Sequence, residues 1–475
     1  MLRSRSAFVK TTPAVGGSAL KARALSSQAQ GVFERLGLSS SGSGSGSPIL
    51  GVYHGASAST TSWSGSGPVV TSHNPATGQV LAKIQTGSRD EVDQVLNTCR
   101  DAYKQWRTVP APTRGVVLSD IQSELKRFKD DLGMVVSLEM GKIASEGRGE
   151  VQEIIDVVEV AQGLARSIGG TVVPSERSEH FITEVANPLG VVGVISAFNF
   201  PTAVYGWNFA LSFTCGNSTI WKPAPTTSLS AIATTKIIAR VLEEHKLPGS
   251  LAALVCGEGE VGATLVNDKR VDLLSFTGSE ARGRQVGAAV ASRFGKTILE
   301  LGGNNAAIVL SDANMQLALR ATLFSALGTA GQRCTTTRRL FLQEDIADDF
   351  LNSLVKAYKS TTTRIGDPTA QDTLIGPLHS QDSVKRFEHA MAEIEKLGGQ
   401  VLVGGKRAQV SDELKGGNWV EPTIVKVPNG GRDFPIMQEE TFAPILYVST
   451  FSTLEEAIEL NNSVEQGLSS ALFTQ

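Results

Sequence analysis

The chain has 475 residues, of which 41% are hydrophobic and 19% charged, and its formal net charge is −3. This length is too great for one simple core, so we expect two or more domains. The small net charge argues against a nucleic-acid surface, and no apolar run is long enough to span a bilayer. The four cysteines are isolated, which argues against a disulfide framework or a structural zinc site.

The first 30 residues differ in composition from the rest of the chain. They contain Lys, Arg, Ser and Ala but no acidic residue, since the first one is Glu34. This composition predicts a mitochondrial presequence and a matrix location, with the cytosol as the alternative. A basic tail without any targeting role is the other interpretation. Residues 31–68 are rich in Ser and Gly, which predicts a flexible lead-in.

Residues 69–168 begin with a short strand and continue as amphipathic helices. Apolar residues recur at three- and four-residue spacing over 90–106 and 111–139, and the pattern resumes over 145–168. Two glycines then end the last helix. Residues 169–189 interrupt the helical pattern and predict an extended arm that protrudes from the molecule.

Short apolar strands alternate with helices from residue 190 onward, as at 191–198, 218–222 and 271–276. This alternation predicts a doubly wound parallel sheet, which residues 69–168 and 190–297 would share. A second α/β unit is expected over 298–475. The fold class is therefore predicted to be α/β, with two doubly wound parallel-sheet domains and a protruding β-arm.

Three segments carry residues suited to acyl chemistry. Cys334 follows Gly331-Gln332-Arg333, and 34 residues earlier Glu300 begins the segment ELGGNN. A thiolate can attack a carbonyl, and a carboxylate can later activate water to release the acyl group. Asn199, within AFNFP, offers a side-chain amide that could stabilise the oxyanion. Taken singly, Cys334 could be an inert buried thiol, Glu300 an exposed residue at a strand end, and Asn199 a turn residue. Taken together, the three residues favour a catalytic site.

Local surroundings suggest how these groups would be tuned. The cation of Arg333 and nearby backbone N–H groups are expected to favour the thiolate of Cys334. Partial burial of Glu300 would raise its pKa toward that of a working base. The other cysteines, Cys99, Cys215 and Cys256, are interpreted as inert buried residues.

Further segments predict a nucleotide site. Gly278, Ser279 and Gly283 connect a strand to a helix, whose N-terminal N–H groups can bind phosphate, although such a turn alone is weak evidence. Lys222 follows a strand and can donate to ribose hydroxyl groups. Glu440 belongs to the segment QEETFAP, which also reads as a polar turn before a strand.

Together these segments resemble the active site of the NAD(P)-dependent aldehyde dehydrogenases. The motifs GQRCTTTRRL, ELGGNNA and AFNFP are similar to those of the α-aminoadipic semialdehyde (antiquitin) branch. The resemblance extends from about Gly51 to the last residue. It implies that residues 69–168 and 190–297 bind the dinucleotide, that 298–475 form the catalytic domain, and that 169–189 form an oligomerisation arm. Full-length family members are tetramers.

The resemblance also assigns roles to individual residues. Cys334 would be the nucleophile, Glu300 the base and Asn199 the oxyanion donor. Glu153 and Arg333 would bind the amino-acid end of the substrate, with a structural ion pair or a solvated Glu on a helix as an equal alternative. No metal is expected. The cofactor-binding residues would be Ala197, Phe198, Lys222, Gly278, Ser279, Gly283, Glu300, Leu301, Glu440 and Phe442.

The implied reaction is the NAD-dependent oxidation of α-aminoadipic semialdehyde to α-aminoadipate in lysine catabolism. NAD is favoured over NADP, although Pro225 stands where many relatives carry a Glu that disfavours a 2′-phosphate. One alternative is a broad-range enzyme that includes betaine aldehyde among its substrates. Another is a catalytically impaired binding or structural protein, because family members continue beyond the position of Gln475 and the C-terminus is expected to be truncated.

Overall fold

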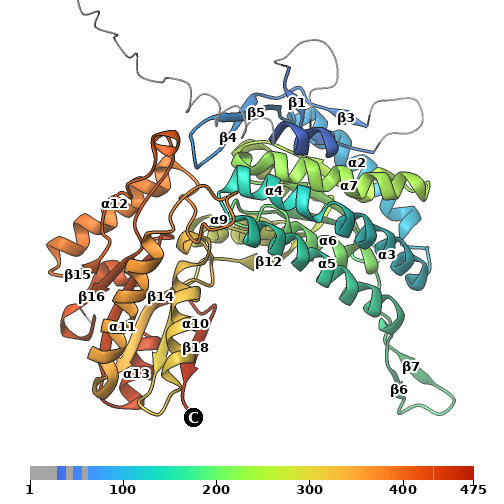
Figure 1. Ribbon diagram of the computed structural model, residues 1–475. Coiled ribbons are helices and arrows are strands. Elements are labelled where there is room, and N and C mark those ends of the chain that lie inside the picture. Colours follow the sequence, from blue (N-terminus) through green and yellow to red (C-terminus); the bar gives the residue numbers. More distant parts are fainter. Residues whose placement is uncertain (1–28, 39–46, 56–61, 432) are drawn as a thin grey trace, which may run out of the picture.

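The computed structural model describes residues 29–38, 47–55, 62–431 and 433–475. Two α/β lobes lie side by side, and a thin two-stranded arm projects from one of them (Figure 1). The predicted presequence lies outside the described residues except for 29 and 30, which begin a short helix that ends at residue 35. Two mainly parallel sheets with flanking helices confirm the predicted fold class.

The first lobe contains a seven-stranded sheet in the order β12-β11-β8-β9-β10-β2-β3. Strands β8, β9 and β10 consist only of buried residues, as strands covered on both faces require. The five parallel strands are β12 (Lys296–Glu300), β11 (Val271–Thr277), β8 (Val191–Ile195), β9 (Ser218–Lys222) and β10 (Ala252–Val255).

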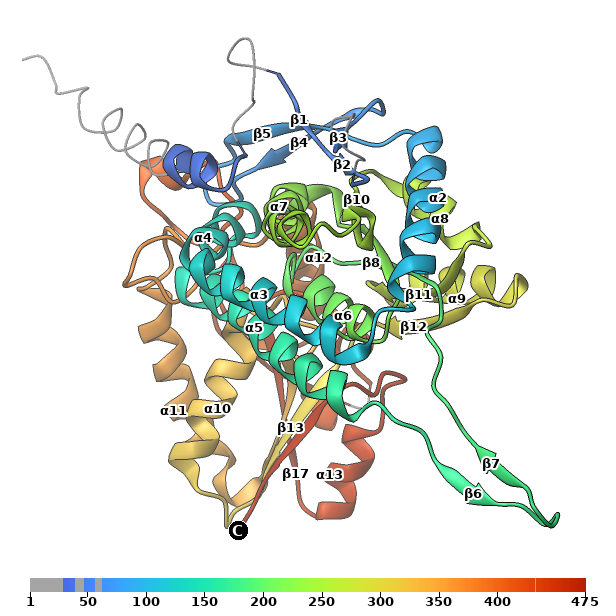
Figure 2. The ribbon, with the colours of Figure 1, turned by 90° about the vertical axis from the view of Figure 1, so that its right-hand side faces the viewer.

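Helices cover both faces of this sheet, as Figure 2 shows. One face packs on α3 (Ala111–Arg127), α4 (Lys129–Met140), α5 (Ala144–Ser167), α6 (Ala203–Thr214) and α7 (Ser228–Glu244). The other packs on α2 (Arg89–Trp106), α8 (Gly259–Asn267) and α9 (Glu280–Ser292). The helix predicted over 111–139 is in fact two helices joined at Phe128.

The second lobe contains a six-stranded sheet in the order β15-β16-β17-β14-β13-β18, and only β15 runs antiparallel to its neighbour. Its strands are β13 (Asn305–Val309), β14 (Thr337–Gln343), β15 (Gln400–Val403), β16 (Thr423–Lys426), β17 (Ile445–Phe451) and β18 (Ser470–Phe473). Its helices are α10 (Met315–Leu327), α11 (Glu344–Thr362), α12 (Gln381–Lys396) and α13 (Leu454–Asn461).

The described part of residues 31–68 is ordered, so the prediction of a flexible lead-in is wrong there. Val32, Leu36 and Leu38 are buried against the first lobe. Short strands β2 (Val52–Tyr53) and β3 (Trp63–Ser64) extend the seven-stranded sheet. A separate sheet contains β1 (Ile49–Leu50), β5 (Val80–Gln85) and β4 (Val69–His73). Apolar residues scattered among Ser and Gly suffice for this order, because strand pairing satisfies the backbone.

The boundary between the lobes also lies later than the predicted residue 297. Strand β12 pairs with β11 throughout its length, so the first sheet extends to Glu300. The second sheet starts at Asn305. Glu300 is therefore the last residue of the first sheet, and the glycines after it belong to the crossing between the lobes.

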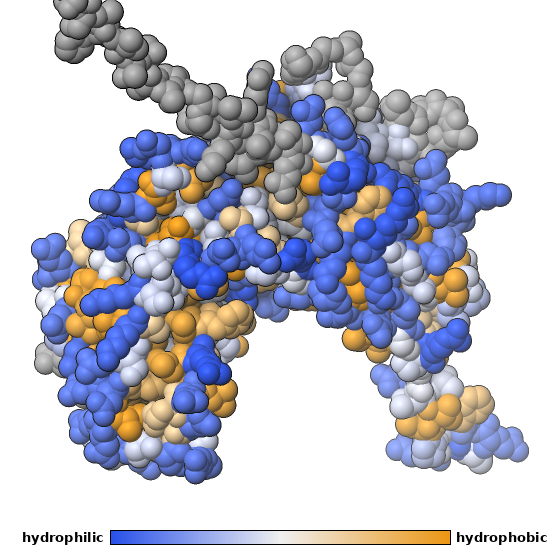
Figure 3. Space-filling model, viewed as in Figure 1, coloured by the Kyte–Doolittle hydropathy of each residue, from blue (hydrophilic) through white to orange (hydrophobic). Residues whose placement is uncertain are grey.

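Residues 169–189 form a projecting hairpin of β6 (Val172–Pro174) and β7 (Phe181–Thr183). Its apolar side chains are exposed, Val172 and Phe181 by 72% and 73%, and they form a hydrophobic band on the arm (Figure 3). Among the described residues, every helix is too short or too polar to cross a bilayer.

Candidate active site

A cavity of ≈ 1050 Å³ lies between the two lobes, and segments that follow strands β8, β11 and β12 contribute to its lining. It brings together most of the residues predicted from sequence, whereas Lys222 and Gly283 lie outside the lining. The predicted residues that line the cavity are Glu153, Ala197, Phe198, Asn199, Gly278, Ser279, Glu300, Leu301, Arg333, Cys334, Glu440 and Phe442.

The backbone that leads to Cys334 is strained. After α10, a short 3₁₀ turn places Thr329 and Ala330 at φ 53° and 51°, and Gly331 follows at φ 73°. A non-glycine residue in this left-handed region costs about 1–3 kcal/mol and persists only where its surroundings impose it. The N–H of Thr329 donates to Glu146 Oε1 over 2.9 Å, which links the turn to α5.

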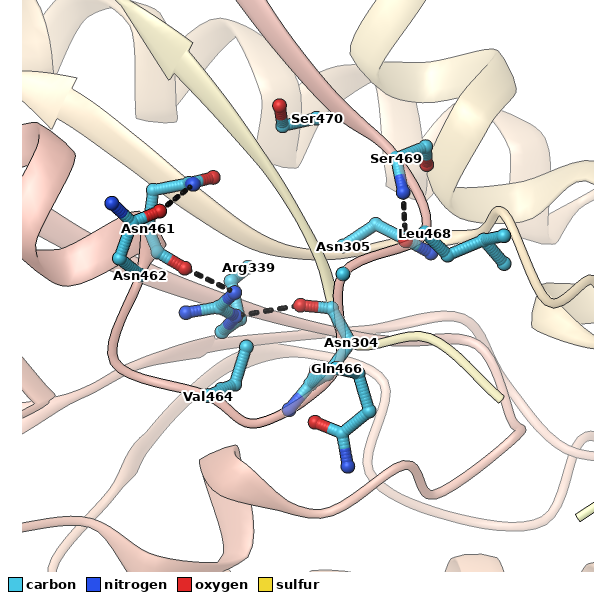
Figure 4. A pocket seen from close by; sticks show the side chains of 11 residues that line it. Asn304, Asn305, Arg339, Asn461, Asn462, Val464, Gln466, Leu468, Ser469 and Ser470 are labelled. Carbon is cyan, nitrogen blue, oxygen red and sulfur yellow. Dashed lines mark hydrogen bonds between the residues drawn. The ribbon is translucent and has the colours of Figure 1, made fainter. Parts of the chain in front are cut away.

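The other side of the Cys334 loop is held by Asn305. Its Nδ2 donates to the carbonyl oxygens of Cys334, at 2.7 Å, and Thr336, at 2.9 Å. Asn305 also lines a smaller cavity of ≈ 470 Å³ (Figure 4). There the Arg339 guanidinium donates to the carbonyl oxygens of Asn304 and Asn461. These contacts tie the thiol-bearing loop to the second sheet.

Contrary to the prediction, the surroundings of Cys334 do not favour the thiolate. Burial, and next the charge of Glu440, raise the pKa of the thiol, whereas backbone N–H groups and Arg338 act in the opposite direction. Arg333 is directed elsewhere, because its Nη2 donates to Glu146 over 2.9 Å. The prediction that Arg333 activates the thiol is therefore wrong for this structure.

Asn199 is buried, and its amide is oriented by the nucleophile loop. Its Nδ2 donates to the carbonyl oxygen of Gln332 over 3.0 Å, two residues before Cys334. The Gln332 side chain is held in turn, since its Nε2 donates to the Thr329 carbonyl and its Oε1 accepts from the His379 N–H. Asn199 is thus held at a fixed position relative to the thiol.

An aromatic cluster lies beside Asn199. The Phe198 and His379 rings are stacked with their centroids 4.5 Å apart. The Phe198 and Phe442 rings meet edge to face with their centroids 5.9 Å apart. His379 Nε2 lies 2.7 Å from Thr226 Oγ1, and Nδ1 lies 3.3 Å from the Met140 carbonyl. Burial lowers the pKa of His379 to about 4, so its ring is neutral at pH 7. This contact between the lobes was absent from the sequence prediction.

The two carboxylates of the cavity have different surroundings. Glu300, at the end of β12, is exposed, so the predicted partial burial is wrong. The backbone carbonyl of Glu300 accepts a hydrogen bond from the Gly278 N–H over 3.1 Å. Burial raises the pKa of Glu440, while Arg338 and the Gly303 N–H, both 3.2 Å from Oε1, act in the opposite direction. An added Cβ at Gly302 would collide with the Glu440 carboxylate. Glu440 is therefore fixed, whereas Glu300 is accessible.

The turn between β11 and α9 fits a phosphate group. Gly278 and Ser279 line the cavity, and Ser279 caps α9 without a side-chain hydrogen bond. The first N–H groups of a helix have no partner within it, so those of α9 remain available. Gly283 has a packing role instead, because an added Cβ would collide with the Leu301 side chain.

Lys222, the last residue of β9, is buried. Its Nζ donates to the Pro223 carbonyl over 3.0 Å, and burial lowers its pKa to about 8. One bond leaves two N–H groups of the ammonium available, and these suit ribose hydroxyl groups. The available helix N-terminus, the Glu440 carboxylate and the cavity volume together fit a dinucleotide.

The far end of the cavity carries several charges. Glu153 opens into it, and the surrounding protein raises the pKa of its carboxyl group, while Lys142 lowers it. Lys142 itself is buried in an ion pair with Glu150 at 2.7 Å, with its Nζ 3.4 Å from the centre of the Phe200 ring. Glu150 also accepts two hydrogen bonds from Thr202 at the start of α6. This buried network supports the loop of Asn199.

The other cysteines behave only partly as predicted. Cys99 and Cys256 are buried, and burial raises the pKa of Cys256 to about 12. Cys215 instead is exposed and lines the large cavity, so its interpretation as a buried residue is wrong. Within the described ranges, no group of three or more His, Cys, Asp or Glu could hold a metal ion.

Comparisons with known proteins agree with this geometry. The family model described as "Aldehyde dehydrogenase family" matches residues 63–475. The chain is 50% identical over 425 residues to the α-aminoadipic semialdehyde dehydrogenase of Bos taurus, an alignment that covers 90% of this chain and 76% of that protein. It is 49% identical over 415 residues to aldehyde dehydrogenase family 7 member A1 of Brassica napus, covering 87% and 82%.

A solved structure gives the same result for the fold. Betaine aldehyde dehydrogenase from Staphylococcus aureus, in complex with NAD+, is 29% identical and superimposes with a TM-score of 0.84, covering 90% of this chain and 83% of that one. The predicted family is thus confirmed by both sequence and structure. The chain belongs to the aldehyde dehydrogenase family.

Proposed function

We propose that this aldehyde dehydrogenase oxidises α-aminoadipic semialdehyde to α-aminoadipate with NAD. The observation that carries the choice of substrate is the presence of Glu153 and Arg333 in the same cavity as Cys334. A carboxylate and a guanidinium can bind the ammonium and carboxylate groups of an α-amino acid. The bovine relative named for this substrate supports the assignment.

Cys334 starts the reaction by adding to the aldehyde carbon. The thiol first gives its proton to solvent water; the thiolate sulfur then forms the bond to carbon, and the carbonyl oxygen becomes an oxyanion. Asn199 Nδ2 and the Cys334 N–H donate to that oxygen, and such a donor contributes about 3 kcal/mol to the transition state. NAD, when bound, supplies the acceptor for the hydride that leaves this adduct, and a thioester remains on Cys334.

Glu300 serves the second half of the reaction. Its exposed carboxylate, beside a pair of glycines, can take a proton from a water molecule that attacks the thioester carbon. The carbon–sulfur bond then breaks, the carboxylic acid leaves, and Cys334 regains its proton.

The cofactor would lie across the cavity from the substrate. The N-terminus of α9 would hold the pyrophosphate, and Lys222 and Glu440 would bind the two riboses. Phe442 would contact the nicotinamide. We favour NAD over NADP because the staphylococcal relative was solved in complex with NAD+. Pro225 does not add to this preference, because it provides no carboxylate that would exclude the 2′-phosphate of NADP. Comparison of KM for NAD and NADP tests this choice.

Three aldehydes would test the substrate: α-aminoadipic semialdehyde, betaine aldehyde and an aliphatic aldehyde of similar length. We expect kcat/KM, measured as NADH formation, to be at least about tenfold higher for the semialdehyde. Arg333→Met should remove this preference and leave betaine aldehyde unaffected, because that substrate has no carboxylate. Equal kcat/KM values in the unmodified protein would instead favour the broad-range alternative.

The arm and the N-terminal segment supply the remaining parts of the proposal. The exposed apolar residues of the arm suit contact with another copy of the chain, so we propose a homo-oligomer, a tetramer as in the family. Phe181→Ser should lower the mass measured by light scattering; an unchanged mass would contradict this role. Residues 1–30 are proposed to direct the protein to mitochondria, which import of a reporter fused to them would test.

A further inference from the structure

Glu146, in the first turn of α5, joins the strained turn before Cys334 to the charged end of the cavity. Its Oε1 accepts hydrogen bonds from the Thr329 N–H and from Arg333 Nη2, both over 2.9 Å. The Glu146 side chain is 13% exposed and that of Arg333 24%. Glu146 does not itself line the cavity, so any effect on a ligand must pass through its partners.

These contacts leave one part of the Arg333 guanidinium available. Its Nε donates to Thr329 Oγ1 over 2.9 Å, and its Nη2 donates to Glu146. Phe200 and Phe324 flank the group, at 5.8 and 5.5 Å from their ring centres. Among the described residues, Nη1 has no hydrogen-bond partner. The guanidinium is thus held on one side and can bind a ligand on another.

The acids of α5 differ in their pairing. Glu150 is paired with Lys142, and Glu146 with Arg333. Glu153 has no ion pair or hydrogen bond to any described residue, although Arg333 is close enough to lower the pKa of its carboxyl group. Arg333 is paired with Glu146 and is also within electrostatic reach of Glu153, so loss of the Glu146 charge would leave Glu153 to attract it. An ion pair between these two would occupy both proposed substrate contacts.

We propose that Glu146 is a positioning residue for substrate specificity: it holds Arg333 away from Glu153, so that both remain free for the amino-acid end of the substrate. This inference rests on the proposed roles of Arg333 and Glu153. It assigns a task to a carboxylate that touches neither the substrate nor the reacting atoms. The same residue supports the Thr329 turn, and the experiment must separate the two effects.

Glu146→Gln separates them, because the amide oxygen can still accept from the Thr329 N–H while the negative charge is lost. We expect KM for α-aminoadipic semialdehyde to rise about tenfold with kcat little changed. Both constants for an aliphatic aldehyde without the amino-acid end should stay within about twofold, which also shows that the variant is folded. Glu159→Gln, an exposed acid on the same helix, is the matched control and should alter neither substrate.

A double variant then tests whether Glu146 acts through Arg333. In an Arg333→Met background, Glu146→Gln should cause no further rise in KM for the semialdehyde. Equal losses for both aldehydes, or an undiminished effect without Arg333, would overturn the inference and leave Glu146 as a support of the turn. An unchanged KM in an enzyme that does prefer the semialdehyde would overturn this inference alone. Absence of that preference in the unmodified protein would overturn the proposed substrate and the inference together.

Discussion

Two turns lead to residues that line the same cavity, and they are built in opposite ways. The turn before Cys334 has three consecutive residues in the left-handed region, and side chains from α5 and β13 bind its backbone. The turn before α9 has ordinary backbone angles at Ser279, and the first N–H groups of the helix are left without partners inside it. In the first turn, hydrogen bonds from the rest of the protein fix the position of the nucleophile. In the second turn, the N–H donors remain available for a ligand. Substitutions should therefore affect chemistry in the first and cofactor affinity in the second.

Cys334→Ala is the strongest test of this contrast. The variant should form no measurable NADH, because no other thiol occupies the strained loop. Its affinity for NAD, measured by calorimetry, should change less than about threefold, since the cofactor turn is untouched. Cys215→Ser, at another point of the cavity lining, is the matched control and should retain turnover. Persistent turnover in Cys334→Ala would exclude Cys334 as the nucleophile.

Glu300→Gln should divide the reaction into its halves. Hydride transfer does not need this carboxylate, so a burst of NADH equal to the enzyme concentration is expected. Thioester hydrolysis does need it, and steady-state turnover should fall by about 10²–10⁴. Rapid-mixing measurements of the burst and the following rate would show both effects. If burst and steady rate declined by the same factor, Glu300 would instead help to activate the thiol.

Asn199→Ala removes the proposed oxyanion donor and its bond to Gln332. We expect kcat to fall by about 10²–10³ with KM for NAD nearly unchanged. Asn208→Ala, at another amide that lines the cavity, serves as the comparison and should have a smaller effect. A loss confined to KM for the aldehyde would indicate that Asn199 only binds the substrate.

Gly283→Ala tests the second turn, the one before α9 that is proposed to bind the cofactor. The added Cβ would collide with the Leu301 side chain, and we expect α9 to shift as a result. Overpacking of this kind costs about 1–3 kcal/mol, so KM for NAD should rise about tenfold. The burst amplitude at saturating NAD should remain that of the unmodified enzyme. A reduced burst under those conditions would mean that α9 also positions the reacting groups.

The strands and their carboxyl ends could be predicted because they follow from local patterns. Buried strands read as apolar runs, and Asn199 lies shortly after the run that forms β8. Strand β12, which ends at Glu300, is exposed along its whole length and carries no such signal. The packing of Val32, Leu36 and Leu38 against the first lobe was not predicted, because Ser and Gly dominate the composition of the surrounding segment. Burial of three scattered apolar side chains gives no periodic signal.

The contacts that orient the site could not be predicted in the same way. Glu146 binds residues more than 180 positions later in the chain, and His379 stacks on a ring 181 positions earlier. No spacing rule connects such pairs, because they meet only when the two lobes pack. The same limit explains the error at Arg333, whose sequence neighbour is Cys334 but whose charge partner is Glu146.

His379 offers the mildest test, one that concerns stability more than turnover. Burial lowers its pKa from 6.5 to about 4, so between these values the unfolded chain binds a proton that the folded protein does not. Its contribution is fully present above pH 6.5 and is lost as pH falls toward 4, by at most about 3 kcal/mol. His379→Gln should therefore lose less stability than the unmodified protein over this range, measured by denaturant unfolding at pH 7 and pH 5. Both proteins must be compared at each pH, because carboxylates also titrate there. Parallel losses would show that the ring already binds a proton in the folded state, and the contact between the lobes at Phe198 would then be a cationic one.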